Sequence, residues 1–156
     1  PRPQPFVAQI IPENRIGDLR IGQSVWTSGC SLLHDPFPNP GTLTYLREVI
    51  EQKTYLMANA PSIFGNSGGG LFHGEWLCLL GLTSRVTAIQ LGFGVDVMSW
   101  MQFSTHPERL YEFFRHHELQ FLVDDSDDFY SAAERRERRR KDALREVLLR
   151  GTGEKS

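Results

Sequence analysis

One serine inside a glycine-rich run constrains the fold of this chain more than any other feature. Residues 64–71 read Phe-Gly-Asn-Ser-Gly-Gly-Gly-Leu, with apolar segments on either side. Each glycine loses more backbone entropy on ordering than another residue would, so such a run marks a sharp bend or a close approach of the backbone. A hydroxyl at Ser67, beside unobstructed N–H groups, suits a nucleophile in acyl transfer. The alternative is a tight turn between two strands.

Length and composition predict one core with an appendage. The 156 residues are 40% hydrophobic and 11% aromatic, which is enough to bury one substantial core. With 17 basic and 19 acidic residues the net charge is −2, so the whole chain lacks the polycationic signature of nucleic-acid or membrane binding. Cys30 and Cys78 are too few for a disulfide scaffold, and their spacing fits no metal site. We expect free thiols packed as small hydrophobes, with no metal and no cofactor.

The sequence contains no sign of a membrane segment. No apolar run reaches the roughly 18 residues expected of a spanning helix, and no basic-then-apolar signal segment opens the sequence. These features favour an intracellular protein without a membrane span. Because the first residue is Pro1 and not methionine, we expect a processed product, an excerpt of a longer chain or a sequence whose start has been removed.

The first two thirds of the chain read as short strands separated by turns. Clusters of proline and glycine at 36–41, polar residues at 51–53 and the sequence His-Gly-Glu at 73–75 mark the connections. The strand from 76 to 82 is predicted to be buried on both faces. Strand-like segments are expected at 6–11, 24–30, 42–50, 54–58, 71–72, 76–82 and 86–97. This pattern favours an all-β fold, a closed antiparallel barrel of six strands, over an α/β layer.

After residue 99 the pattern becomes helical. Thr105 can cap a helix that carries one apolar face, an acidic break follows at 124–128, and residues 132–150 favour a second helix. We therefore expect C-terminal α-helices after the barrel. The predicted domains are a lead-in over 1–14 from a missing or separate barrel, the barrel over 15–105, a packing helix over 106–120, and an acidic break with a basic tail over 121–156.

The last predicted helix is locally basic. Residues 134–150 hold eight Arg or Lys against four Asp or Glu, and the basic residues concentrate between Arg135 and Lys141. Such a helix can contact nucleic acid or an acidic protein surface. A solvated helix face is the commoner explanation, because Glu134 with Arg138, and Glu137 with Lys141, form i to i+4 pairs that stabilise an isolated helix.

The segment around Ser67 resembles a known nucleophile motif. Residues 65–69 (Gly-Asn-Ser-Gly-Gly) resemble that of trypsin-like, chymotrypsin-fold serine proteases, and their surroundings are most similar to the HtrA/Deg-type branch. Four landmarks carry this resemblance in order, over roughly residues 15–105. They are the Gly-x-x-Val strand at 22–29, the strand and apolar loop at 55–64, the Leu-Gly-Leu step at 80–82 and the Gly-Phe segment at 91–95.

The resemblance implies the second barrel of a two-barrel fold. In that family the nucleophile lies in the second barrel, and the catalytic histidine and aspartate lie in the first. The serine corresponds to Ser67, and the oxyanion-hole N–H donors correspond to Gly65 and Ser67. No position matches the base, so we expect an N-terminal barrel or a second chain to supply it, and this chain alone to be inactive. The five histidines in the chain are interpreted as surface residues: His34, His73, His106, His116 and His117.

The resemblance also implies a substrate pocket. Pro61, six residues before Ser67, corresponds to the pocket base, which predicts an apolar pocket for a small or medium aliphatic side chain. Thr83, Ser84 and Arg85 correspond to the pocket wall and the edge that pairs with substrate. For Arg85, a salt-bridged surface role is the favoured interpretation.

Two functions follow from these features. The first is a serine endopeptidase, a hydrolase acting on peptide or protein substrates, with this chain contributing the nucleophile. The second is a catalytically inactive trypsin-fold module, for example a viral or shell component, that acts through its basic helix. The intact Gly-Asn-Ser-Gly-Gly motif favours the first, because a purely structural descendant would be free to lose the serine.

Overall fold

The computed structural model describes residues 7–152. The first six residues of the expected lead-in lie outside this range. The chain divides into two compact units, one ending at Leu110 and one beginning at Tyr111, which are described separately.

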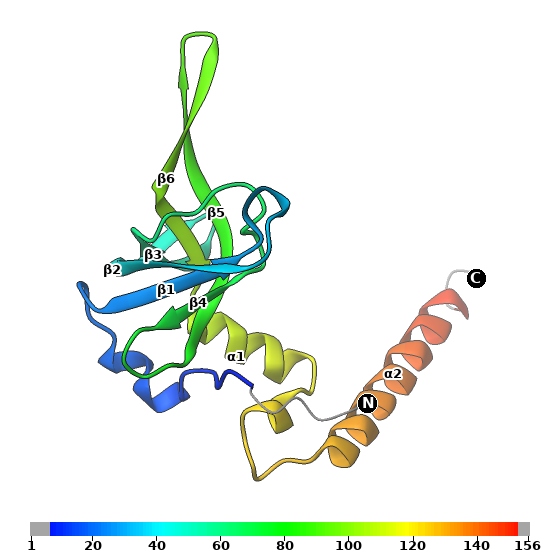
Figure 1. Cartoon of the computed structure of the whole chain (residues 1–156). Helices are drawn as coiled ribbons and strands as arrows, with labels where there is room; N and C mark the ends of the chain where they lie inside the picture. Colours follow the sequence, from blue (N-terminus) through cyan, green and yellow to red (C-terminus); the bar gives the residue numbers. More distant parts are fainter. Residues whose placement is uncertain (1–6, 153–156) are drawn as a thin grey trace. The chain divides into compact units, whose positions relative to one another are not determined.

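The first unit is a closed antiparallel β-barrel (Figure 1). Around the barrel the strands follow the order β1-β2-β3-β6-β5-β4. The expected all-β, six-stranded fold followed by helices is therefore confirmed. The strands are β1 (Ser24–Gly29), β2 (Phe37–Ile50), β3 (Lys53–Ala58), β4 (Gly70–His73), β5 (Leu79–Leu91) and β6 (Gly94–Thr105).

The helices are short except for the last. Three are 3-10 turns, and α1 begins in the first unit and ends in the second. The second unit otherwise contains one 3-10 turn and the long helix α2, which covers the predicted segment 132–150. The bounds are η1 (Glu13–Asp18), η2 (Ser31–Leu33), α1 (Pro107–His116), η3 (Gln120–Leu122) and α2 (Phe129–Thr152).

The expected strand at 6–11 is wrong. Within the described part of this segment, Ile10 forms a single isolated bridge to Leu79. The Ile11 N–H donates to the Leu79 carbonyl at 3.0 Å, and the Leu79 N–H donates to the Gln9 carbonyl at 2.7 Å. One bridge is too short to count as a strand, because Pro12 stops the pairing directly after it.

The expected loop at 36–41 is also wrong, because β2 begins at Phe37 and pairs with β1 through this segment. Ser28 lies opposite Pro38, and Trp26 lies opposite Pro40. Prolines two residues apart lack their N–H groups on the same edge of a strand. The neighbour β3 pairs with β2 only from Leu43 onward, so the missing donors cost no ladder hydrogen bonds.

The β4–β5 connection differs from the prediction as well. The strand expected at 76 begins at Leu79, and Leu77 adopts a left-handed φ of 52° in the turn. The strand is not buried on both faces, because a barrel strand has one inner face: Leu80 is fully buried, whereas Leu82 is 39% exposed. The interior is formed mainly by fully buried side chains from all six strands, among them Val25, Leu43, Leu56, Leu71, Leu80 and Gln102.

The β5–β6 hairpin projects well beyond the barrel (Figure 1). Its outer part pairs in register from Thr87 opposite Met98 to Leu91 opposite Gly94. A register shift between Val86 and Thr87 separates this outer ribbon from the barrel part. The two-residue turn at the tip is where Gly92, with a φ of 60°, and Phe93 reverse the chain.

Candidate functional site

Ser67 lies in the β3–β4 connection, on a loop held by backbone hydrogen bonds. The Asn66 N–H donates to the Ile63 carbonyl at 3.1 Å, and the Gly69 N–H donates to the Asn66 carbonyl at 2.9 Å. Two further bonds tie the loop to β5: the Gly68 N–H donates to the Thr83 carbonyl at 2.7 Å, and the Thr83 N–H donates to the Gly69 carbonyl at 2.8 Å. The Ser67 side chain is therefore presented from a fixed backbone, and the residue is exposed.

Two glycines of the run are required by a close approach of the backbone. Gly65 has a φ of 100°, and a Cβ there would overlap the Cys30 carbonyl oxygen. A Cβ on Gly69 would overlap the Ser28 carbonyl oxygen. Gly68 has a φ of 85° but open space around it, so backbone conformation alone accounts for glycine there.

Asn66 anchors the loop from beneath. It is 2% exposed, and its Oδ1 accepts a 2.6 Å hydrogen bond from the Oγ of Ser31 in η2. The Leu32 N–H donates to the Phe64 carbonyl at 2.9 Å, so η2 holds the loop at two points. A Cβ on Gly29 would lie 2.9 Å from the Asn66 Cα. Sequence reasoning missed Ser31, because no local signal links it to a residue 35 positions later.

The N–H groups around Ser67 divide into two sets. Those of Asn66, Gly68 and Gly69 donate to backbone carbonyls. Those of Gly65 and Ser67 donate to no other described residue, nor does the Ser67 hydroxyl. The two unpaired N–H groups belong to the residues that the resemblance assigned to an oxyanion hole.

A cavity of about 190 Å³ opens beside Ser67. Thr83, Ser84 and Arg85, all predicted as pocket residues, line it, whereas the exposed Pro61 does not. Ser62, the residue after Pro61, does line the cavity; it is 1% exposed, and its Oγ has no hydrogen-bond partner among the described residues. The full lining is Ser62, Ile63, Phe64, Ser67, Thr83, Ser84, Arg85 and Val86.

The side chain of Arg85, one of the residues that line this cavity, is held by an ion pair. Its guanidinium lies 2.5 Å from the carboxylate of Glu51, in the β2–β3 turn, and 5.7 Å from the ring centre of Tyr55. The Glu51 hydrogen bond raises the pKa of Arg85, and the same hydrogen bond lowers the pKa of Glu51. The cation beside Ser67 is thus already partnered.

His73 is not the surface turn residue that the sequence predicted. It ends β4 and is 1% exposed, with its ring stacked on Trp76 at 4.0 Å between centres. Its Nδ1 accepts from the N–H groups of Glu75 at 3.2 Å and Trp76 at 3.1 Å. Burial lowers the pKa of His73. The neutral His73 ring accepts the hydrogen bonds that hold the turn, which explains why the ring is buried.

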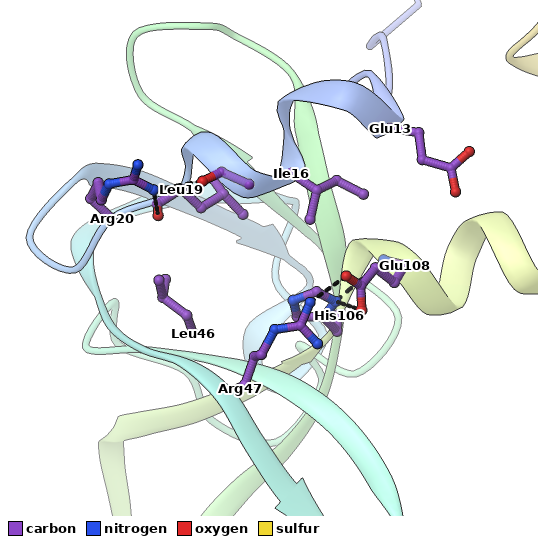
Figure 2. Close-up of a pocket in the computed structure, with 9 residues that line it drawn as sticks. Glu13, Ile16, Leu19, Arg20, Leu46, Arg47, His106 and Glu108 are labelled. Carbon is purple, nitrogen blue, oxygen red and sulfur yellow. Dashed lines mark hydrogen bonds and ion pairs between the residues drawn. The ribbon is translucent and has the colours of Figure 1, made fainter.

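His106 is also buried, contrary to the prediction. Its Nδ1 accepts from the Glu108 N–H at 3.3 Å and lies 3.5 Å from the Glu108 carboxylate, which is itself paired with Arg47 (Figure 2). Burial lowers the pKa of His106, and the Arg47 hydrogen bond lowers the pKa of Glu108. These residues line a separate cavity of about 310 Å³ that shares no lining residue with the cavity at Ser67.

The remaining histidines are exposed, as predicted: His34 after η2, and His116 and His117 at the end of α1. Over residues 7–152, no histidine hydrogen-bonds to Ser67. The cysteine prediction is half right, because Cys78 is buried whereas Cys30 is exposed; both are free. No cluster of three or more metal-type side chains occurs in the described part of the chain.

Two arginines of α2, the basic helix of the second unit, form ion pairs with acidic residues of the same unit. Arg135 lies 2.8 Å from Glu118 and 2.6 Å from Asp127, and Arg139 also pairs with Glu118. These hydrogen bonds, Asp127 first, raise the pKa of Arg135. Sequence reasoning missed this cluster. Of the two i to i+4 pairs that it predicted, Glu134 with Arg138 and Glu137 with Lys141, the second is observed at 3.6 Å. None of the helices between residues 7 and 152 is long and apolar enough to cross a membrane.

Searches against known proteins find a likeness in structure but not in sequence. No protein-family model matches the chain, and no curated protein matches it. Among solved structures, the HtrA-type protease AlgW with a tripeptide has a TM-score of 0.54 at 18% identity, over 74% of this chain and 36% of that chain. An AlgW variant with a decapeptide has a TM-score of 0.55 at 14% identity, over 71% of this chain and 33% of that chain.

The likeness shows a shared fold. The six-stranded barrel resembles part of the HtrA-type protease structures, as the sequence motif implied. This chain spans about a third of the length of those AlgW chains.

Proposed function

We propose that this chain is the nucleophile-bearing barrel of a trypsin-like serine endopeptidase. The observation that carries the proposal is the pairing of an exposed Ser67 with the unpartnered N–H groups of Gly65 and Ser67 beside a cavity. Unlike the N–H groups of Asn66, Gly68 and Gly69, which donate to backbone carbonyls, these two exposed donors are open to an outside acceptor. The fold shared with HtrA-type proteases supports the same function.

In the proposed reaction, the Ser67 oxygen attacks the carbonyl carbon of a peptide bond while a base removes its proton. The carbonyl oxygen becomes an oxyanion that accepts hydrogen bonds from the Gly65 and Ser67 N–H groups. The C–N bond then breaks, the amine leaves with the proton from the base, and the acyl group remains on Ser67. Water hydrolyses this ester and regenerates the enzyme.

The base is proposed to come from outside residues 7–152. His73 and His106 are buried in contacts of their own, and neither bonds to Ser67. The histidine and aspartate would be contributed by an N-terminal barrel or a second chain. Because such residues act as a unit, this chain alone would retain at most residual activity.

The substrate is proposed to be a polypeptide whose side chain enters the cavity lined by Thr83, Ser84 and Arg85. The AlgW structures that share this fold contain a decapeptide and a tripeptide. Pro61 is dropped from the proposed pocket because it does not line the cavity, and Ser62 takes its place.

The proposal is tested by proteolysis with the full-length gene product. The natively unfolded protein β-casein is incubated with the wild-type protein, with Ser67→Ala and with Ser24→Ala. Ser24 is an exposed serine on β1, and its variant serves as the matched control. Cleavage by wild type and by Ser24→Ala, with a loss of roughly 10⁴-fold or more in Ser67→Ala, is expected. Equal cleavage, or none, by all three proteins would favour the inactive structural module instead.

A further inference from the structure

The β5 strand leaves the barrel with one edge unpaired. β4 pairs with β5 only as far as Leu82, and the loop carrying Gly68 and Gly69 takes both backbone groups of Thr83. Beyond that point β6 covers one edge of β5 up to the tip, and no described strand covers the other. An uncovered edge is a template for a further strand.

The register identifies which groups of this edge are open. Leu91 and Gly94 flank a two-residue turn, and flanking pairs of such turns exchange hydrogen bonds. Hydrogen-bonded and non-hydrogen-bonded pairs then alternate along the ribbon, which places Ile89 and Thr87 with their N–H groups toward β6. Ala88 and Gln90 fall between them, so their N–H and C=O groups face the open edge.

The β5 strand of the outer hairpin, residues 86–91, carries neither a charged residue nor a proline, two of the usual protections of a free edge. From Val86 to Met101 its one charged residue is Asp96, and it contains no proline. Ile89 is 42% exposed and Val95 is 69% exposed. A two-stranded ribbon is at best marginally stable alone in water, so this edge is suited to gaining a third strand.

The open edge starts at the candidate active site. Arg85 and Val86 line the cavity that contains Ser67, and the edge runs from Val86 past Ala88 to Gln90. The outer edge of β6 offers no such path, because β6 turns into the barrel to pair with β3 over Gln102–Thr105. A strand added to β5 is therefore continuous with the bond that Ser67 would attack.

We propose that the hairpin is a substrate-recognition arm: residues upstream of the scissile bond add to the β5 edge as an antiparallel third strand, bonded to Ala88 and Gln90. The inference rests on the proposed function and names its substrate as an unfolded, charge-poor polypeptide. An antiparallel strand runs from the hairpin tip toward the cavity, so the upstream side of the substrate occupies the arm. From Val86 to Gln90 this adds about 14 Å of extended chain.

Binding to the full-length Ser67→Ala protein tests the arm without requiring catalysis. The probes are fluorescein-labelled alternating Thr/Val peptides that carry three or seven residues upstream of one central leucine, and a third peptide extended downstream instead. The seven-residue peptide is expected to bind at least tenfold more tightly than the other two. Equal affinities, or tighter binding of the downstream extension, would overturn the proposal.

Two modifications test the pairing itself. N-methylation at successive upstream positions should weaken binding at every second residue, because alternate N–H groups face β5. Ala88→Pro removes an outward N–H and should abolish the advantage of the long peptide, whereas the matched Ala88→Thr should keep it. If N-methylation weakens binding equally at every position, strand addition is contradicted. The proposal that Ser67 is a nucleophile would be unaffected by that result. Conversely, an unreactive Ser67 with period-two binding would refute the endopeptidase and retain the arm.

Discussion

The Oγ of Ser31 donates a 2.6 Å hydrogen bond to the Oδ1 of Asn66, the residue that precedes the exposed Ser67. Asn66 is buried, and its Nδ2 has no hydrogen-bond partner among the described residues. This one bond from η2 is therefore the main polar restraint on the side chain beneath the Ser67 loop. It connects two segments 35 residues apart.

Ser31→Ala is expected to destabilise the first unit and loosen the Ser67 loop. The substitution leaves the buried Asn66 oxygen without its partner, which costs about 1–3 kcal/mol. Urea denaturation measures the change in unfolding free energy. Ser24→Ala, at an exposed position, serves as the control and should change it by less than about 0.5 kcal/mol. Equal losses of unfolding free energy in both variants would show that the hydrogen bond from Ser31 to Asn66 does not stabilise the first unit.

Gly65→Ala and Gly68→Ala separate backbone strain from steric overlap. Both glycines have positive φ, so both variants incur the left-handed penalty of about 1–2 kcal/mol. Only at Gly65 would the new Cβ also meet the Cys30 carbonyl oxygen. We expect Gly65→Ala to lose clearly more unfolding free energy in urea denaturation. A larger loss for Gly68→Ala would contradict the described packing.

The stability of the barrel should fall as the pH drops through 6.5. Burial lowers the pKa of His73 and of His106 below the ordinary value of 6.5. The unfolded chain then binds more protons than the folded one between the lowered pKa values and 6.5, so the unfolding free energy decreases with falling pH in that window. Glu108, whose pKa is lowered by Arg47, contributes a further loss only below 4.5.

Denaturation curves at pH 7.5, 6.5 and 5.5 measure this slope. His73→Gln should flatten it, whatever its effect on stability at pH 7.5, because one of the two groups no longer titrates. His34→Gln, at an exposed position, serves as the matched control. An unchanged slope in His73→Gln would show that the ring is not kept neutral by burial.

Glu51→Gln should change the charge preference of the cavity beside Ser67. The variant leaves the Arg85 guanidinium without its partner at 2.5 Å. Because the pair is largely exposed, we expect little loss of stability. Binding of peptides to the Ser67→Ala background should shift in favour of Glu over Gln next to the cleavage position. The double variant with Arg85→Gln should abolish the shift, and persistence of the shift would exclude Arg85 as its cause.

The sequence predicted the features that depend on local patterns. The glycine run required a close approach, which Gly65 and Gly69 show, and alternating strands with turns implied the six-stranded barrel. Features that depend on distant partners were missed. The prolines at 38 and 40 suggested a loop because their open edge is visible only once β3 is placed. The burial of His73 likewise depends on the turn hydrogen bonds that its ring accepts.

The sequence predicted the nucleophile of the candidate site better than the residues that line its cavity. Ser67, Gly65 and the β5 residues 83–85 came from the resemblance of the motif and its surroundings. The structure places Ser67 and residues 83–85 around one cavity, whereas Gly65 is not among its lining residues. Pro61 was placed by counting back from Ser67, but the loop directs Ser62 and Ile63 to the cavity instead. The charge of Arg85 was correctly weighed as a salt bridge, although its partner Glu51 lies 34 residues away.

Labelling with a biotinylated fluorophosphonate tests the central claim, that Ser67 is an activated nucleophile, most directly. The full-length gene product is treated with the probe, digested and mapped by mass spectrometry. A single adduct on Ser67 is predicted, absent from Ser67→Ala and retained in Ser24→Ala. A folded protein that contains every segment of the gene product and forms no adduct, or forms it on another residue, would contradict the account.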